Sequence, residues 1–311
     1  MPTRIALVSA REALALDEDM EPLEVALREA GAEVVTPFWD DAAVDWRRYA
    51  AAVLRSTWDY VERIDEFLAW ADRCAQQTLL LNPPAVVRWN TDKHYLIELA
   101  QQGIPVVPTR FVEPGSIAAR QIEQFLGGGA DALTAGHANS FVEFVEFVVK
   151  PSIGAGSKDT ARYHRHEVAR AADHLARLLA QGRSAMLQPY LGRVDEVGET
   201  ALIYLGGEFS HAIRKGPLLR TGAALVAGLF APEQITPRQP QPDELAVARQ
   251  AYAAIGSSRP VYARIDLIRS ADDAPVVLEL ELTEPSLFFA HAPGSAQRFA
   301  RVVLERAGSA G

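Results

Sequence analysis

The sequence predicts a mixed fold, α/β in its first part and α+β in the remainder. Over about the first eighty residues, short apolar runs alternate with helix-like stretches, as in a parallel sheet with helices on its faces. The later residues contain strand pairs joined by short turns. We expect an N-terminal parallel-sheet domain over residues 1–88, a helix linker and small α+β subdomain over residues 89–187, and a strand-rich C-terminal domain over residues 188–311.

The first domain is expected to hold four strands and two helices. The strand-like runs are RIALVSA, AEVVTPFW, AAVLRST and TLLLNPP, and helices are expected at about residues 20–30 and 63–77. No G-x-G-x-x-G follows the first run, so a dinucleotide site is not indicated there. The third run leads into LRSTWDY, and such residues at a strand end are typical of a cleft. Arg55, Thr57 and Asp59 are therefore candidate substrate ligands.

The middle of the chain predicts a subdomain that could clamp a ligand. One helix carrying Lys93 is expected between residues 85 and 103, with Asn90 or Thr91 as its N-cap and Gly103 at its end. Residues 127–140 are expected to be a mobile surface loop. The remaining runs predict, in order, an extended segment, a helix, a strand–turn–strand unit, a helix and a strand: IPVVPTRFV, SIAARQIEQFL, FVEFVEFVVKPSIGAGSKDTARY, HEVARAADHLARLLAQG and AMLQPYL.

The last part is strand-rich and ends in a helix. The run ETALIYLGGEFSHAIRKGP predicts a hairpin that turns at Gly206 and Gly207. A second strand pair is expected in VYARIDLIRS and APVVLELELTEPS, and GSAQRFARVVLERAG predicts the terminal helix.

Composition and charge indicate which kinds of partner the protein can bind. The net charge of −9 argues against a nucleic-acid or anionic-membrane surface. No apolar run has the ~18–20 residues of a membrane span, and the N-terminus lacks a signal-peptide layout, so we expect a cytoplasmic protein. The single Cys74 excludes an internal disulfide and is expected to be a buried residue on a helix. A small-molecule partner is favoured, and a homo-oligomer is compatible with the sequence.

The stretch VVKPSIGAGSKD suggests a phosphate-binding turn. Lys150 ends a strand, and Gly154 and Gly156 allow backbone N–H groups to approach phosphate oxygens. A plain hairpin with glycines at its turn is the alternative. The order of residues is not that of a P-loop.

Three carboxylates suggest a metal site. Glu279 and Glu281 are two residues apart on a predicted strand, so their side chains share a face. If an antiparallel neighbour brings Asp266 to that face, the carboxylates need a cation between them, and Mg²⁺ prefers such hard oxygen ligands. The alternative is the solvent-facing side of an edge strand.

Arginines near strand ends are candidates for holding a substrate carboxylate. Arg55, Arg214 and Arg264 could each bind a carboxylate or phosphate through two parallel hydrogen bonds. Structural salt bridges are the alternative for each. The run QPYL, taken alone, is an ordinary strand–loop junction.

Taken in order, these motifs resemble the ATP-grasp superfamily, and the resemblance covers nearly the whole chain. It is most similar to the branch of bacterial glutathione synthetase and ribosomal-protein glutamate ligases. The stretches LRSTWDY, NPPAVVRWNTDKHYL and IRKGP resemble the cyclo-ligases that close O-ureidoserine to cycloserine. The motifs that carry the superfamily resemblance are DK at residues 92–93, KPSIGAGS, QPYL, RIDLI and ELELTEP.

The resemblance implies an N-terminal (pre-ATP-grasp) domain, a lid and a catalytic domain that bind ATP and two Mg²⁺ ions. It implies an acyl phosphate made on an amino-acid-like substrate, with Arg214 and Arg264 as catalytic arginines and Arg55, Thr57, Asp59 and Arg214 holding the substrate. Where the family usually has Asn, this chain has Glu281. The implied nucleotide ligands are Lys93, Lys150, Gly154, Gly156 and Ser157 for phosphates, Gln188, Pro189, Tyr190 and Leu191 for adenine, and Glu199 or Glu196 for ribose; the implied metal ligands are Asp266, Glu279 and Glu281.

Three classes of function stay open. The first is a carboxylate–amine ligase or intramolecular cyclo-ligase, the second another ATP-grasp phosphoryl transfer, and the third a nucleotide-binding regulator without turnover. The complete set of metal-ligand candidates speaks against the regulator, because their loss is the simplest route to an inactive relative.

Overall fold

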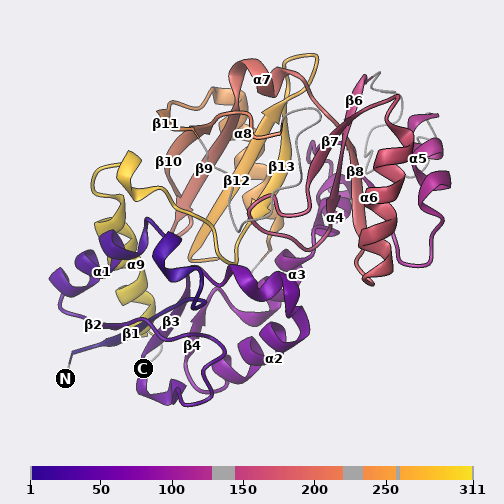
Figure 1. Cartoon of the computed structure of the whole chain (residues 1–311). Coiled ribbons are helices and arrows are strands. Elements are labelled where there is room, and N and C mark those ends of the chain that lie inside the picture. The colour runs from indigo at the N-terminus through magenta and orange to yellow at the C-terminus, as the bar shows by residue number, and fades with distance from the viewer. Residues whose placement is uncertain (1, 128–143, 220–233, 257–259, 310–311) are drawn as a thin grey trace.

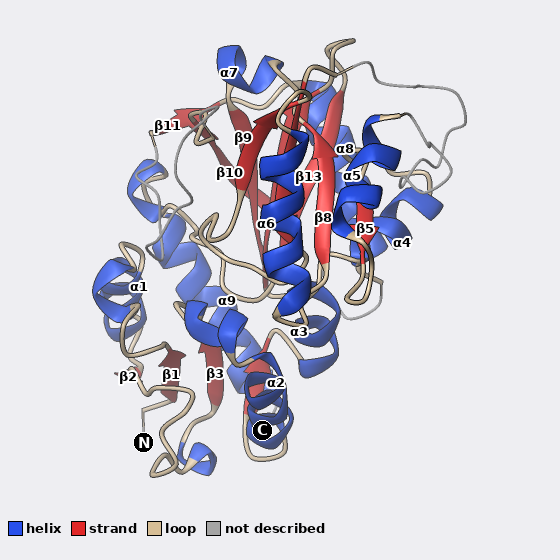
Figure 2. Cartoon of the chain, turned by 45° about the vertical axis from the view of Figure 1, so that its right-hand side comes forward, coloured by secondary structure: helices blue, strands red, loops and turns tan. Residues whose placement is uncertain are grey.

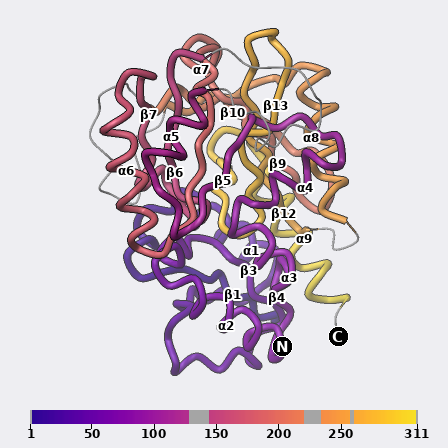
Figure 3. Tube along the Cα trace, turned by 90° about the vertical axis from the view of Figure 1, so that its right-hand side faces the viewer, coloured from indigo at the N-terminus to yellow at the C-terminus, as the bar shows by residue number. Residues whose placement is uncertain are grey.

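The computed structural model describes residues 2–127, 144–219, 234–256 and 260–309. These residues form three separate sheets, as the mixed fold class predicts. In Figures 1 and 3 the unit built from the N-terminal sheet lies below the other two. The expected boundaries at 88/89 and 187/188 stay predictions, and the second of them falls within a strand of the middle sheet.

The N-terminal sheet is parallel, in the order β2-β1-β3-β4. Its central strands are buried on both faces, which is why their sequences are continuous apolar runs. Ile5 and Leu7 face α1 and α9, and Ala6 and Val8 face α2 with its buried Cys74. The elements are β1 (Arg4–Val8), β2 (Glu33–Val35), β3 (Ala51–Leu54), β4 (Leu79–Leu81), α1 (Met20–Glu29), α2 (Ile64–Ala75) and α9 (Ser295–Ser309).

Helix α9 comes from the far end of the chain. It lies beside α1 in Figure 1, where it is yellow against the indigo of the first unit. Phe299 and Val303 are fully buried in the cluster that also holds Leu23 and Leu27 of α1. The C-terminal helix thus completes the core of the N-terminal unit.

The middle sheet is antiparallel, in the order β5-β8-β6-β7. Two helices cover one face and bury a single cluster with it (Figure 2). The expected loop over residues 127–140 lies, apart from Gly127, outside the described residues. The elements are β5 (Arg110–Val112), α5 (Ala118–Leu126), β6 (Glu146–Pro151), β7 (Ala161–His164), α6 (Val168–Ala180) and β8 (Ala185–Pro189).

The C-terminal sheet is also antiparallel, in the order β11-β10-β9-β12-β13. Helices α4 and α8 pack on one face of it, and a cavity borders the other. Among the described residues, no helix is long and apolar enough to cross a membrane. The elements are α7 (Arg193–Val197), β9 (Glu199–Leu205), β10 (Glu208–Lys215), β11 (Ile235–Arg238), α8 (Pro242–Ala254), β12 (Tyr262–Arg269) and β13 (Pro275–Glu281), with short 3-10 helices at Leu14–Leu16, Trp46–Arg48, Trp58–Glu62 and Phe289–His291.

The expected single helix around Lys93 is wrong in two respects, because Asn90 and Thr91 lie inside a helix and do not cap its start. It is two helices, α3 (Pro84–Thr91) and α4 (Tyr95–Gln101), with Lys93 between them. Asp92 is extended, at φ −106° and ψ 119°, and its carboxylate accepts a hydrogen bond from the His94 N–H at 3.2 Å. An Asp side chain that bonds a nearby backbone N–H competes with helical hydrogen bonding and favours such a break.

Candidate active site

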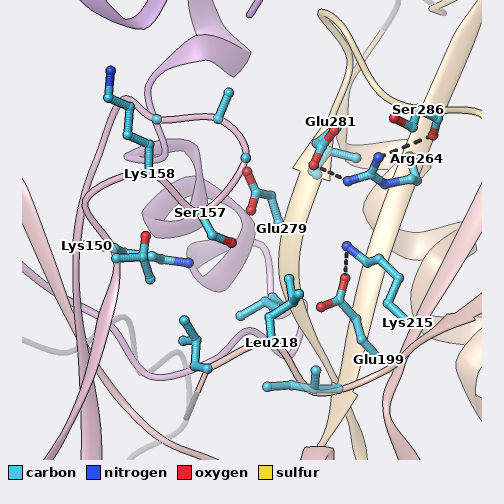
Figure 4. A pocket seen from close by; sticks show the side chains of 18 of the residues that line it. Lys150, Ser157, Lys158, Glu199, Lys215, Leu218, Arg264, Glu279, Glu281 and Ser286 are labelled. Atoms are coloured by element: carbon cyan, nitrogen blue, oxygen red, sulfur yellow. Dashed lines mark hydrogen bonds and ion pairs between the residues drawn. The ribbon is translucent and has the colours of Figure 1, made fainter. Parts of the chain in front are cut away.

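A cavity of about 560 Å³ lies where the three units meet. Its wall includes the glycine turn after β6, the end of β8, one face of the C-terminal sheet and parts of the N-terminal unit. Figure 4 shows Lys150 and Ser157 on one side of it and Arg264, Glu281 and Lys215 on the other.

The register of the C-terminal sheet gathers charges on the cavity face. Asp266 pairs with Glu279 across β12 and β13, and Arg264 pairs with Glu281. Side chains directly opposite in neighbouring strands share a face, so all four lie together. The structure therefore brings the three metal-ligand candidates onto one surface.

Asp266 is held by two cations. The Arg264 guanidinium donates to both of its oxygens, from Nε at 2.9 Å to Oδ1, and Lys215 Nζ lies 2.8 Å from Oδ2. Although burial opposes ionisation, these neighbours keep the Asp266 pKa well below its usual range. Arg264 also contacts Glu281, and Lys215 contacts Glu199. Burial raises the pKa of both these glutamates to about 8.

Two lysines line the cavity from the middle of the chain. Lys93 Nζ lies 3.0 Å from Glu279 Oε1 and donates to the Gly154 carbonyl at 2.9 Å. Lys150 has no ion pair among the described residues, and burial lowers its pKa to about 8. An amine in a buried setting without an anion is suited to receive one.

The glycine turn reaches across to the N-terminal unit. Gly156 and Ser157 both have φ of +61°, so the chain bends sharply there. Ile153 and Ala155 pack against the aromatic cluster of the N-terminal unit, and Lys158 pairs with Glu62. Gly154 is close to Pro151, because a Cβ on it would lie 3.1 Å from the proline Cγ. The turn thus forms one wall of the cavity.

The predicted adenine and ribose ligands are only partly brought together. Gln188, Pro189, Tyr190 and Leu191 all line the cavity, and Gln188 Nε2 donates to Thr109 Oγ1 at 2.8 Å. Of the two ribose candidates, Glu199 lines it and is buried. Glu196 lies outside the lining, with 73% of its side chain exposed. The structure therefore favours Glu199.

Arg214 does not reach the cavity lining, and Lys215 does. Arg214 pairs with Thr200 and Lys215 with Glu199, so the two side chains lie on opposite faces of the sheet. Arg214 instead donates from Nε to the Val197 carbonyl at 2.8 Å. Strand alternation thus places Arg214 away from the site expected for a catalytic arginine, whereas Arg264 lies in it.

Arg55, Thr57 and Asp59 are likewise not part of the cavity lining. Arg55 is buried, with its NH2 atom 3.5 Å from Asp17 and 3.6 Å from Asp19. Thr57 is fully buried, and Asp59 accepts a hydrogen bond from the indole of Trp39 at 2.8 Å. The placement gives these residues structural contacts and does not support substrate binding.

Trp58 and Tyr60 of LRSTWDY line the cavity, in agreement with the cleft expected at that strand end. Two other lining residues were missed from the sequence: Lys215, and Glu284 in ELELTEP. Strand alternation alone could not have found Lys215, because a bulge between Phe209 and His211 shifts the register of β9 and β10 by one residue, and without it Arg214 would lie opposite Glu199. For Glu284 the sequence held no signal beyond an acid after the metal-ligand strand.

The donor set partly fits Mg²⁺. Glu279 and Glu281 line the cavity with about a quarter of each side chain exposed (24% and 25%), and carboxylate oxygens suit this hard ion. Both oxygens of Asp266 already face cations. Among the described residues, no group of three His, Cys, Asp or Glu side chains converges on one point. Glu279 and Glu281 are the residues best placed to hold a metal ion.

Comparison with known proteins identifies relatives along the whole chain. A family model described as the N-terminal domain of D-cycloserine synthetase DcsG matches residues 5–82. The cycloserine biosynthesis protein DcsG of Streptomyces lavendulae is 42% identical over 307 residues, which cover 97% of this chain and 98% of the relative.

Solved structures agree with this. The crystal structure of D-cycloserine synthetase DcsG is similar with a TM-score of 0.88 and 41% identity, over 98% of this chain and 99% of that one. The ATP-grasp ligase PsnB has a TM-score of 0.60 at 17% identity, over 98% and 100%, which shows a shared fold. The chain belongs to the DcsG family within the ATP-grasp superfamily, and it is an ATP-dependent ligase that works with ATP and Mg²⁺.

Proposed function

We propose that the enzyme closes O-ureidoserine to cycloserine. The observation that carries the proposal is the 42% identity to the cycloserine biosynthesis protein along nearly the full length of both chains. The charged cavity supports it, because it offers cations for phosphates and carboxylates for metal and ammonium groups. We further propose a cytoplasmic enzyme that can form a homo-oligomer, which light scattering would test.

The nucleotide would lie along the side of the cavity formed by the glycine turn. Lys93, Lys150 and the N–H groups of the turn would hold the phosphates, with Gly154, Gly156 and Ser157 over them. Glu199 would accept the ribose hydroxyls, and the end of β8 would hold adenine. Glu279 and Glu281 would hold Mg²⁺, which neutralises charge on the transferring phosphoryl group, and Asp266 would join them, for the two ions that the family resemblance implies, only if its bonds to Lys215 and Arg264 open.

The reaction has to activate a carboxylate and then close a ring. A carboxylate oxygen attacks the γ-phosphorus, ADP leaves and an acyl phosphate forms. The nitrogen bonded to the ether oxygen then attacks the acyl carbon, inorganic phosphate leaves and the nitrogen loses its proton. That nitrogen still carries a carbamoyl group, so one water must remove it, giving carbon dioxide and ammonia.

Arg264 is the residue best placed to orient the carboxylate. It lies on the cavity wall beside Glu281, and its guanidinium can stabilise negative charge that develops on the acyl oxygen. The glycine turn and the N-terminal unit enclose the site, which limits loss of the acyl phosphate to water.

The test is to supply O-ureidoserine and Mg-ATP with no second amine. We expect equal amounts of phosphate and ammonia, with a cyclic product seen by mass spectrometry. Phosphate release only after a separate amine is added would reject the cyclisation and indicate a ligase that joins two substrates.

A further inference from the structure

Glu284 is a buried carboxyl group on the cavity wall. Only 8% of the residue is exposed, and it follows the end of β13 by three residues. The N-terminal unit fixes its backbone: Trp58 Nε1 donates to the Glu284 carbonyl at 3.1 Å, and Arg55 Nη1 donates to the Pro285 carbonyl at 3.3 Å. The point from which the side chain projects is therefore set by contacts within the protein.

This carboxyl group lacks a cationic partner within the described part of the chain. Its polar neighbour is the buried hydroxyl of Tyr60, which opposes the rise that burial causes in the pKa of the carboxyl group. By contrast, Glu199, Glu279 and Glu281, on the same cavity wall, each pair with a lysine or arginine. Buried carboxylates are normally paired with a cation, so Glu284 is poised to accept one from a ligand.

The neighbouring charges place Glu284 beside the reacting end of the cavity. Lys93, Glu279 and Arg264 are near enough for their charges to act on its ionisation, and burial raises its pKa to about 7. A carboxylate held by Arg264 would thus lie close to Glu284. In an α-amino acid the ammonium group is one carbon away from that carboxylate.

We propose that Glu284, oriented by Tyr60, binds the ammonium group of an α-amino-acid substrate. The inference rests on the proposed function, because it assumes that the carboxylate activated at this site belongs to an amino acid. It makes Glu284 a substrate-binding residue and Tyr60 a positioning residue. A substrate without the amino group would leave the carboxyl group buried and unpaired, so the site should reject it.

The test compares O-ureidoserine with its desamino analogue, 3-(ureidooxy)propionate. For Glu284→Gln we expect kcat/KM for O-ureidoserine to fall about 100-fold, mainly through KM, because a charge-assisted contact in a buried site is lost. The KM for ATP and the slow turnover of the analogue should change less than about threefold. Tyr60→Phe should show the same selectivity with a smaller loss, about three- to tenfold.

Two further variants show whether the loss comes from the charge at position 284. Glu284→Asp retains the charge on a shorter side chain and should recover part of the loss. Glu18→Gln removes the same charge from an exposed residue on the same cavity wall, and it should leave both substrates within about threefold. Thermal melting of each variant checks that it is folded, and Glu284→Asp alone serves if the glutamine variant is not.

Two results would overturn the proposal. One is an equal loss on both substrates in Glu284→Gln, and the other is a selective loss in Glu18→Gln instead. If the wild-type enzyme does not turn over O-ureidoserine, the proposed function fails separately. The same variants would then be compared on each amino acid that supports ADP release and on its desamino form, and equal losses would again reject the ammonium site.

Discussion

Glu279 is the residue at which the two sides of the cavity meet. It projects from the C-terminal sheet, and its carboxylate contacts Lys93, which in turn holds the Gly154 carbonyl of the glycine turn. Lys93 and Lys150 lower the Glu279 pKa, although burial acts against ionisation. The carboxylate is therefore charged when ATP and metal arrive.

Replacing Glu279 with glutamine removes this charge and keeps the shape. We expect turnover to fall by more than about 100-fold, because even residues that only support a metal ligand cost 10- to 100-fold. Glutamine can still accept a hydrogen bond from Lys93, so the melting temperature should change little. Steady-state rates measured at increasing Mg²⁺ give the result, and wild-type turnover in this variant would reject the metal assignment.

The sequence predicted which types of residue form the site better than it predicted the face of the strand on which each side chain lies. The face shared by Glu279 and Glu281 follows from strand alternation and was predicted, whereas the position of Asp266 opposite Glu279 was only a condition that the strand register now meets. Lys215 takes the place expected for Arg214 because a bulge in β10 shifts the strand register by one residue, and alternation alone does not reveal this bulge. The burial of Arg55 could not be predicted, because its acidic partners lie in a loop 36 to 38 residues earlier in the chain.

The glycine turn is the element on which nucleotide binding should act most. Its contacts with the N-terminal unit are the packing of Ile153 and Ala155 and the Lys158–Glu62 ion pair at the protein surface. Two packed side chains and one surface ion pair are few contacts, so the turn can open locally and belongs to the less stable parts of the fold.

Hydrogen exchange measures this directly. Amides over residues 152–160 should exchange more slowly when Mg-ATP is added, because phosphate oxygens would accept hydrogen bonds from them. Amides of β1, which lies in the N-terminal core, serve as the internal reference. Unchanged exchange in the turn at saturating nucleotide would contradict its assignment to the phosphates.

The break between α3 and α4 makes the stability of the fold depend on pH. His94 stacks on Phe111 with ring centroids 4.0 Å apart and lies 2.6 Å from Asp92 and 3.1 Å from Glu113. The hydrogen bond with Asp92 is the main cause of a raised His94 pKa, which burial partly offsets. The folded state thus binds the proton more tightly than the unfolded state.

Protonated His94 stabilises the fold. This stabilisation is fully present below the pKa of about 6.5 that His94 has in the unfolded chain, and it is lost as the pH rises through the higher pKa of the folded state. We expect the melting temperature of the wild type to exceed that of His94→Gln at about pH 6 and to approach it at about pH 9. Melting curves of both proteins across this range give the difference, and a constant difference would contradict the role of His94.

Elements with a clear apolar period were predicted, whereas α7, α8, β11 and the break at Asp92 were not. Helix α8 was missed because its buried residues are Glu244, Ala248 and Ala251, which do not form an apolar stripe. The buried Glu244 accepts a hydrogen bond from Thr200 at 2.8 Å. The break at Asp92 was missed because a local hydrogen bond, from the His94 N–H to the Asp92 carboxylate, interrupts a helical pattern that continues on both sides.

Across the whole molecule, a buried charge cluster joins the N-terminal unit to residues 285–289, which follow β13. Asp19 accepts hydrogen bonds from the backbone N–H groups of Leu287, Phe288 and Phe289, at 2.5, 3.0 and 2.8 Å. Arg55 lies between Asp19, Asp17 and the Pro285 carbonyl. Burial makes this cluster sensitive to the loss of any member.

Arg55→Met should destabilise the fold by about 3–5 kcal/mol, because it leaves buried carboxylates without their cation. The matched control is Arg88→Met, which breaks the surface pair with Asp72 and should cost at most about 1 kcal/mol. Urea unfolding of both variants measures the change in the free energy of unfolding. A stable Arg55→Met protein with a selectively raised KM for the amino-acid substrate would instead support the original assignment to substrate binding.

The order of the three sheets along the chain could be predicted, because each has its own strand pattern. How they meet could not, because the contacts that join them are long-range. Asn82 illustrates this: its side chain donates to the carbonyls of Tyr262 and Leu282, about 180 to 200 residues later. The sequence shows the asparagine but does not show which carbonyl groups it contacts.

The packing of α9 on the first sheet has a consequence for synthesis on the ribosome. The strand Arg4–Val8 leaves the exit tunnel more than 280 residues before the helix that completes its core. The nascent chain must carry Ile5, Leu7 and the α1 face of Leu23 and Leu27 without that cover until α9 has emerged. The core of the N-terminal unit thus matures only after the two sheets that follow it have been made, and a chain that stalls before Phe299 should be a client for chaperones that bind exposed apolar segments.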